Sequence, residues 1–171
     1  LFGLISRLLL MSLCVAPTLN LIPRSCMSLL IPILIDIPLT NPSYSTSPDD
    51  ETFKYIAMTY AGNHPHMSDP NRPGCDSPKN PFAKQGGITN GAAWYPLTGG
   101  MQDYNYIWHG AMEVTLELSC CKFPPSTELP QFWDDNRNSL LQFMGEAHRG
   151  VKGFVKDETL KPIEGASMKV T

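Results

Sequence analysis

The glutamate at position 117 stands at the end of a stretch that alternates like a β-strand, in the segment EVTLELS. A carboxylate near the C-terminal end of a strand points into the crevice where open α/β sheets bind their ligands. A pocket there can raise the pKa of a carboxyl group toward neutral pH, which suits a general base. Glu117 is therefore the first candidate catalytic residue. The alternative is a solvated residue on the polar face of a strand.

Two further polar side chains precede this strand, Tyr95 in WYPL and Gln102 in GGMQD. The pair Gly99-Gly100 lies between them and lets the backbone bend closely between the two segments. Tyr95 and Trp94 are alternatively half-buried packing aromatics, and Gln102 is alternatively an ordinary polar residue after a turn. The spacing by itself leaves both alternatives open.

The histidines and cysteines offer no clear metal site. A catalytic zinc takes three protein ligands and keeps one position open. Among the four histidines, only His66 has a potential ligand three residues later, Asp69, and that pair lies in a proline-rich loop. The adjacent Cys120 and Cys121 lack the two-residue spacer of a zinc knuckle. The sequence therefore predicts no metal ligands.

A helix is expected to begin near Ser47. Ser47 is a candidate N-cap, Pro48 occupies the tolerated first position, and the acidic residues at 49–51 complement the helix dipole. An apolar stripe then follows at helical spacing, formed by Phe53, Ile56, Ala57 and Tyr60. Residues 61–93, rich in Pro, Gly and Asn, are predicted to form a long loop.

A strand and a second helix are expected further along the chain. From Met112 apolar residues alternate with polar ones, which predicts a strand. Residues 130–150 follow with Gly150 as a stop signal and an apolar stripe of Trp133, Leu140, Met144 and Ala147. We expect both helical stripes to face the core. A strand between two amphipathic helices predicts an α/β fold.

Composition divides the 171 residues into three parts. Residues 1–46 form an apolar, Pro-interrupted segment that is targeting-like or unrelated to the rest, and its prolines leave no run long enough to span a membrane. Residues 47–150 hold the α/β part. Residues 151–171 predict two short strands around a turn, the start of a β-rich domain. A net charge of -3 without a basic stripe argues against a nucleic-acid partner; membrane contact is left open.

Four features follow one another along the chain: GGITNGAAWYPLTGGMQDYNYIW, EVTLELSCCKFPP, a helix and HRGVKGFVKD. Together they resemble the N/E subfamily of zinc metallocarboxypeptidases, which contains carboxypeptidases D, E, M and N. The resemblance runs from about residue 44 to residue 171. It implies an incomplete carboxypeptidase-like mixed sheet with flanking helices in residues 47–150. It also implies that residues 151–171 open a truncated transthyretin-like β-sandwich.

The resemblance also implies an activity, the zinc-dependent removal of C-terminal residues, usually Lys or Arg, from peptide or protein substrates. By motif, Glu117 matches the catalytic base, Tyr95 the tyrosine that closes over the substrate, and Gln102 the floor of the specificity pocket. The family points to an extracellular or secretory location. A disulfide from one of the two adjacent cysteines to a distant partner such as Cys75 is possible in a secreted relative.

The zinc ligands of the family are missing from the sequence. The family draws them from an HxxE motif and a later histidine, upstream of the helix near Ser47, and this sequence contains no HxxE. The arginines that hold the substrate carboxylate also lie upstream in the family. We therefore expect this chain as given to be inactive, with the sheet edge beside its strand exposed. The alternatives are a non-catalytic peptide- or protein-binding relative and a truncated product without function.

Overall fold

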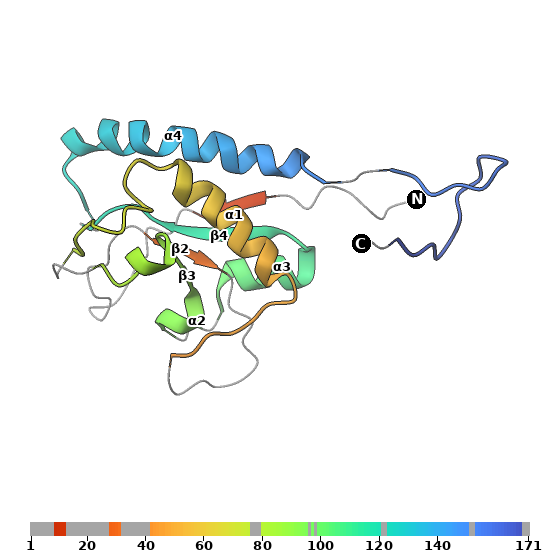
Figure 1. The fold of residues 1–171 in the computed structure, drawn as a ribbon, viewed down its shortest axis with the longest axis horizontal. Helices are drawn as coiled ribbons and strands as arrows, with labels where there is room; N and C mark the ends of the chain where they lie inside the picture. Colours follow the sequence, from red (N-terminus) through yellow and green to blue (C-terminus); the bar gives the residue numbers. More distant parts are fainter. Residues whose placement is uncertain are drawn as a thin grey trace.

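The computed structural model describes residues 9–12, 28–31, 42–75, 80–95, 97, 99–120, 123–150 and 153–168. Its centre is a mixed four-stranded sheet with the strand order β1-β4-β2-β3 (Figure 1). The strands are β1 (Leu9–Ser12), β2 (Ser28–Ile31), β3 (Ile88–Asn90) and β4 (Met112–Glu117). β4 pairs in parallel with β1 and antiparallel with β2, and β2 pairs in parallel with β3.

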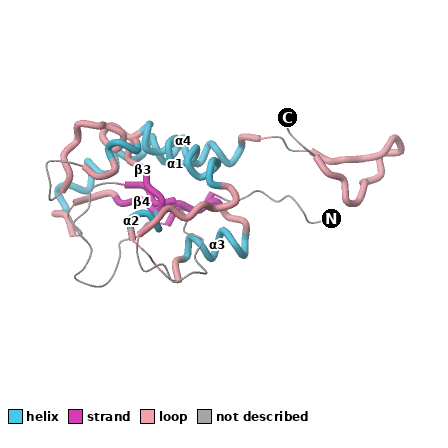
Figure 2. Tube along the Cα trace, turned by 60° about the horizontal axis from the view of Figure 1, so that its bottom comes forward, coloured by secondary structure: helices cyan, strands magenta, loops and turns pink. Residues whose placement is uncertain are grey.

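Helices cover both faces of the sheet (Figure 2). Helices α1 (Asp50–Asn63) and α4 (Leu129–Gly145) pack together on one face. Helix α3 (Met101–His109) lies on the opposite face, and the short helix α2 (Gly91–Trp94) follows β3 directly. The described residues also form the 3-10 turns η1 (Ala83–Gln85), η2 (Ser126–Glu128) and η3 (Glu146–His148). This mixture of helices and strands fits the expected carboxypeptidase-like α/β fold.

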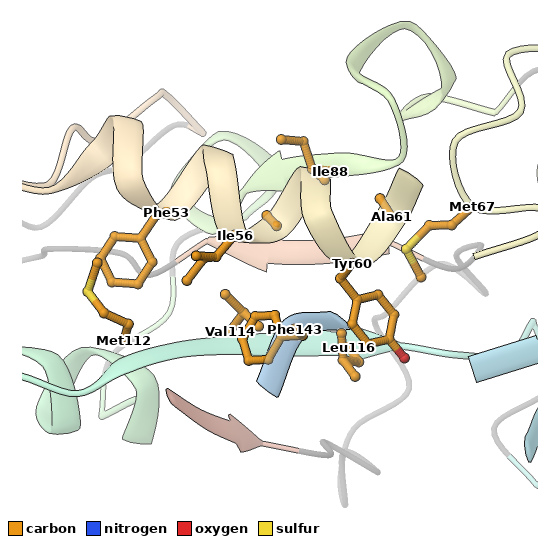
Figure 3. Packing of buried hydrophobic residues seen from close by; sticks show 11 residues of the cluster. Phe53, Ile56, Tyr60, Ala61, Met67, Ile88, Met112, Val114, Leu116 and Phe143 are labelled. Carbon is orange, nitrogen blue, oxygen red and sulfur yellow. The ribbon is translucent and has the colours of Figure 1, made fainter. Parts of the chain in front are cut away.

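Helix α1 confirms the predicted apolar stripe but begins later than expected. Its four stripe residues are at most 4% exposed and form the centre of the core together with β4 and α4 (Figure 3). The helix starts at Asp50, and Asp49 takes the N-cap position without a side-chain cap bond. Ser47 is not the N-cap, because its carbonyl accepts from the Asp50 N–H in a turn before the helix (3.2 Å).

The buried face of α4 differs from the predicted stripe. Trp133 and Met144 are 60% and 52% exposed, whereas Phe143 is fully buried. The buried face also carries the polar residue Asn136. Its Oδ1 accepts a hydrogen bond from the Tyr60 hydroxyl of α1 at 2.5 Å. The predicted stripe is therefore wrong at Trp133 and Met144, whereas its member Leu140 packs against the core. The helix also ends at Gly145 rather than at Gly150.

Strand β4 is confirmed, but it is an interior strand. Val114 and Leu116 on one face and Glu113 and Thr115 on the other are all at most 3% exposed. The expectation of an exposed sheet edge beside β4 is wrong, because β1 and β2 pair with its two sides. These two strands come from the segment 1–46 that composition had set apart.

Two other segments differ in detail from the sequence prediction. The segment predicted as one long loop, 61–93, contains the end of α1, η1, β3 and most of α2. Residues 153–168 extend away from the sheet and are exposed throughout (Figures 1 and 2). The predicted hairpin there is reduced to a single antiparallel bridge between Lys156 and Pro162 around a turn. A transthyretin-like domain is not confirmed.

Candidate active site

Glu117 is the last residue of β4 and lies half-buried at the end of the strand. Side chains alternate along a strand, so Glu117 shares a face with Glu113 and Thr115, opposite the apolar core side formed by Val114 and Leu116. Burial raises the pKa of its carboxyl from the usual 4.5 to about 7. A carboxyl group with this pKa exchanges a proton with water near neutral pH, which is what a general base needs.

Gln102 lies in the first turn of α3 and is 6% exposed. Its carboxamide folds back over Gly100. A Cβ placed on Gly100 would lie only 3.0 Å from Gln102 Oε1, so a glycine suits this position. Gly99 adopts a left-handed conformation with φ of 75°, as a turn at this pair requires. The structure thus places Gln102 on the helix that covers the Glu117 face of the sheet.

Tyr95 follows α2 and belongs to a row of aromatic rings. Its ring lies 4.9 Å from that of Trp94, whose ring in turn lies 5.4 Å from Phe82. The segment is anchored by Asn90, whose side chain caps α2 by accepting from Ala93 N–H and donates to the carbonyl of Ser45 at 2.8 Å. Trp94 is therefore a packing residue, and the substrate-closing role of Tyr95 stays a prediction.

The polar face of β4 holds a pair that the sequence analysis missed. The Asn105 side-chain amide of α3 donates a short hydrogen bond to Oε2 of Glu113, which is 3% exposed. The available signal was the position of Glu113, four residues before Glu117 on the polar face of the predicted strand. Spacing alone could not identify its partner, because that depends on how α3 turns into β4.

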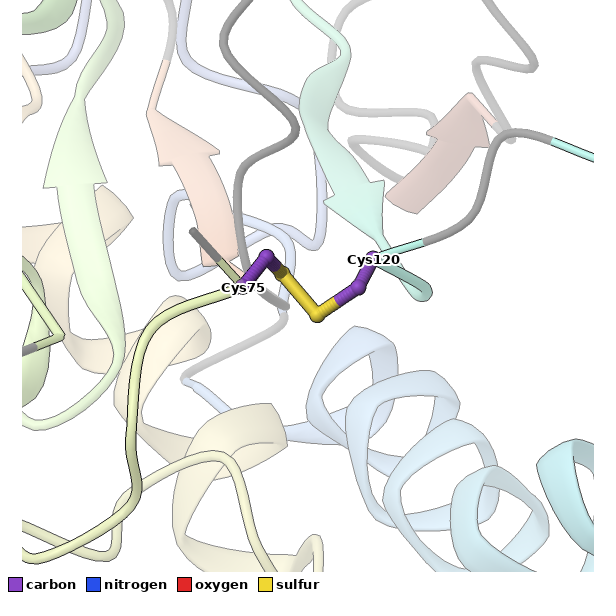
Figure 4. Close-up of a disulfide and its surroundings, with 2 residues drawn as sticks. All are labelled: Cys75 and Cys120. Carbon is purple, nitrogen blue, oxygen red and sulfur yellow. A yellow bond between two sulfur atoms is a disulfide. The ribbon is translucent and has the colours of Figure 1, made fainter. Parts of the chain in front are cut away.

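A disulfide joins Cys75 to Cys120, three residues after Glu117 (Figure 4). The two Cα atoms are 5.3 Å apart, and the bond links the loop after α1 to the end of β4. The pairing expected for one of the adjacent cysteines is therefore confirmed for Cys120. Cys121 lies outside the described residues.

The described part of the chain does not fit a zinc ion. No three His, Cys, Asp or Glu side chains come together within it. Asp69 accepts the backbone N–H of Asn71 at 2.8 Å, so its carboxylate shapes a loop turn. His64 is buried, and its Nδ1 accepts the backbone N–H groups of His66 and Met67, both at 3.1 Å. Burial lowers the pKa of His64 to about 4.

Comparison with known proteins decides the family. The model of the zinc carboxypeptidase family matches residues 29–139. The chain belongs to the zinc carboxypeptidase family. By family it is related to zinc-dependent carboxypeptidases, as the motifs around Tyr95, Gln102 and Glu117 implied.

Several curated relatives share about half of the aligned residues with this zinc carboxypeptidase chain. "Carboxypeptidase E" of Caenorhabditis elegans is 52% identical over 126 residues, which cover 72% of this chain and 27% of that protein. "Carboxypeptidase D" of Anas platyrhynchos is 55% identical over 126 residues, 71% of this chain and 9% of that protein. "Carboxypeptidase M" of Mus musculus is 47% identical over 128 residues, 75% of this chain and 28% of that protein. The chain thus spans little more than a quarter of these relatives, or less.

The family match also extends further toward the N-terminus than composition suggested. It begins at residue 29, inside the segment 1–46, and it includes most of β2 and all of β3 and β4. Within the part of the chain that the structure describes, no helix has the length and apolar character needed to cross a membrane.

Proposed function

We propose that this chain contributes the general base and part of the specificity pocket to a carboxypeptidase that removes C-terminal Lys or Arg residues from peptides. The observation that supports this most directly is Glu117, which stands at the carboxyl end of a central strand with a pKa of about 7. Families of this kind act on the substrate's C-terminal peptide bond, and a base near neutral pH serves that chemistry.

Glu117 carries the proton transfers in this proposal. Ionised Glu117 accepts a proton from the attacking water and then returns it to the amine of the departing residue. Because burial raises its pKa, the carboxyl can hold this proton near pH 7 until the departing amine takes it. The activity of a carboxypeptidase that contains this segment is therefore expected to rise with pH through about 7 as Glu117 ionises.

Gln102 and Tyr95 bind the substrate in this proposal. A buried carboxamide presents both a donor and an acceptor, so Gln102 at the pocket floor can hydrogen-bond a long polar side chain such as Lys or Arg. Tyr95 follows α2 at the end of an aromatic row and closes over the bound residue with its phenol. These roles are supported by the family motifs around both residues.

Zinc is the family's metal, and it acts by polarising the scissile carbonyl and lowering the pKa of bound water. The described residues supply no ligand set for it, and the sequence contains no HxxE. We expect the 171-residue chain alone to bind no zinc at a catalytic site and to hydrolyse no peptide. The secretory pathway or the extracellular space is the proposed location, supported by the Cys75–Cys120 disulfide, since such bonds persist in oxidising compartments.

Two measurements test this proposal. The isolated chain should show no zinc stoichiometry after metal loading and no release of Lys from a peptide ending in Lys. A chimera should then be built in which the matching segment of Caenorhabditis elegans carboxypeptidase E is replaced by residues of this chain. The chimera should release C-terminal Lys and Arg in preference to Ala.

In this chimera, Glu117→Gln should lower kcat by about 100-fold to 10,000-fold, the usual contribution of a general base. The matched control is Glu128→Gln, an exposed carboxylate of η2, which should leave kcat unchanged. A chimera that folds, binds zinc and retains full activity with Glu117→Gln would rule out the proposed base.

A further inference from the structure

The corner between α3 and β4 is fixed by both the backbone and the side chain of Asn105. Helix α3 ends in a left-handed Gly110 with φ of 62°. The Gly110 N–H bonds to the Tyr106 carbonyl at 3.0 Å, and the Ala111 N–H bonds to the Asn105 carbonyl at 3.1 Å. The bond from Gly110 to Tyr106 is that of an αL cap. The Asn105 side chain then reaches past the cap and donates to Glu113 in β4.

This corner folds the helix back along the strand that follows it (Figure 1). Asn105 lies three residues after Gln102, so the two side chains project from the same side of α3. Glu113 lies four residues before Glu117, so these two project from the same face of β4. The Asn105–Glu113 bond therefore joins the helix that carries Gln102 to the strand that carries Glu117.

We propose that Asn105 and Glu113 are positioning residues that hold the pocket glutamine, Gln102, in register with the catalytic strand. The proposal rests on the proposed roles of Gln102 and Glu117. Glu113 is 3% exposed, and Gln102 is 6% exposed, so both lie within the interface between α3 and β4. Glu113 is buried and Asn105 is half-buried, so their hydrogen bond is partly shielded from solvent.

Helix α3 is also tied to α1, because the Tyr106 hydroxyl donates a hydrogen bond to Asp49 Oδ2 at 2.9 Å. Its other side is exposed, with Met101, Tyr104, Ile107 and Trp108 each more than half exposed. The inner side holds Gln102 and Asn105 against the sheet, and the ring of Tyr106 packs edge-on to Phe53 at 5.0 Å. Tyr106 keeps its contacts to α1 when the Asn105–Glu113 bond is lost, so α3 should turn about Tyr106 and Gln102 should move with it.

Exchange of the two polar groups provides the test. Asn105→Asp keeps the size of the side chain and removes the donor, leaving two carboxyl groups face to face. Glu113→Gln keeps an acceptor for Asn105, so this single change should be mild. The double variant Asn105→Asp with Glu113→Gln restores one hydrogen bond with the donor and acceptor exchanged.

The first readout uses the full 171-residue chain and needs no activity. NMR should follow the side-chain amide signal of Gln102 and the titration of Glu117 for each variant, with thermal unfolding recorded beside them. We expect Asn105→Asp to shift the Gln102 signal and to displace the Glu117 midpoint from about 7. The double variant should restore both, and Glu113→Gln should change neither.

The second readout uses the active chimera. There Asn105→Asp should lower kcat/KM for a peptide ending in Lys by roughly 10- to 100-fold, the cost of misplacing a substrate-binding group by about 1 Å. The double variant should recover most of this loss.

The two proposals fail in different ways. An inactive wild-type chimera refutes the proposed function, while the NMR readout still decides the positioning role. If Asn105→Asp leaves the Gln102 signal and the Glu117 midpoint unchanged, the positioning role is overturned. It is overturned as well if the double variant restores thermal stability and leaves both signals displaced, because the pair is then only structural.

Discussion

The substitution Glu117→Gln should expose a pH dependence of stability that is hidden in the unmodified chain. Burial raises the pKa of Glu117 from 4.5 to about 7, so between these values the folded chain holds a proton that the unfolded chain releases. Stability from this group is complete below pH 4.5 and is lost as the pH rises toward 7.

His64 acts in the opposite direction. Burial lowers its pKa from 6.5 to about 4, so between these values the unfolded chain binds a proton that the folded chain does not. Stability from this group is complete above pH 6.5 and is lost as the pH falls toward 4. The two windows overlap between pH 4.5 and 6.5, where the slopes have opposite signs and largely cancel.

The size of each effect follows from the separation of the folded and ordinary pKa values. At about 1.36 kcal/mol for each pH unit, either group contributes at most about 3 kcal/mol to the free energy of unfolding. Solvent around the half-buried Glu117 reduces its share, so about 3 kcal/mol is an upper bound.

Urea unfolding between about pH 4 and pH 8, followed by fluorescence, measures these slopes. The unmodified chain should change little between pH 4.5 and 6.5. Glu117→Gln should gain stability as the pH rises through this range, whereas His64→Asn should lose it. Glu128→Gln, an exposed control, should follow the unmodified chain. If Glu117→Gln also follows it, the buried environment assigned to Glu117 is wrong.

Further substitutions test the packing. Replacing Cys75 and Cys120 by Ser removes a disulfide that closes a loop with a sequence separation of 45 residues. The chain-entropy relation predicts that the free energy of unfolding, measured in urea, falls by about 4 kcal/mol. A fall of less than about 1 kcal/mol would contradict a stabilising role of the disulfide. Gly87→Ala should abolish the soluble folded form in expression trials, because Gly87 has φ of 82° and an added Cβ collides with the backbone of the loop after α1. Phe143→Ala should lower unfolding free energy by about 3 to 5 kcal/mol, whereas exposed Trp133→Ala should change it by less than about 0.5 kcal/mol. Equal losses at these two positions would refute the assigned face of α4.

The sequence predicts elements well where one residue pattern controls burial. The stripe from Phe53 to Tyr60 and the alternation from Met112 both correspond to buried faces of the structure. The pattern is only partly right for α4, because the side facing α1 carries Asn136, whose partner is the distant Tyr60. A pattern of apolar residues cannot locate a buried polar residue whose hydrogen-bond partner lies far away in the sequence.

Short strands and long-range partners set the other limits. β1, β2 and β3 have four, four and three residues, too few for an alternating pattern to appear. The position of Glu117 at a strand end was predictable, since it depends on local alternation alone. The bond from Asn105 to Glu113 was not, because it depends on the left-handed turn at Gly110.

The place of β4 within the sheet has a consequence for biosynthesis. β4 follows the other three strands of the described sheet in sequence, yet it lies between β1 and β2. At a translation rate of about 5 to 20 residues per second, the hundred or so residues between β1 and β4 take roughly 5 to 20 s to emerge. During that interval β1 and β2 have no central partner, so a chaperone that shields extended apolar segments would bind the nascent chain before residue 112 leaves the ribosome and release it afterwards.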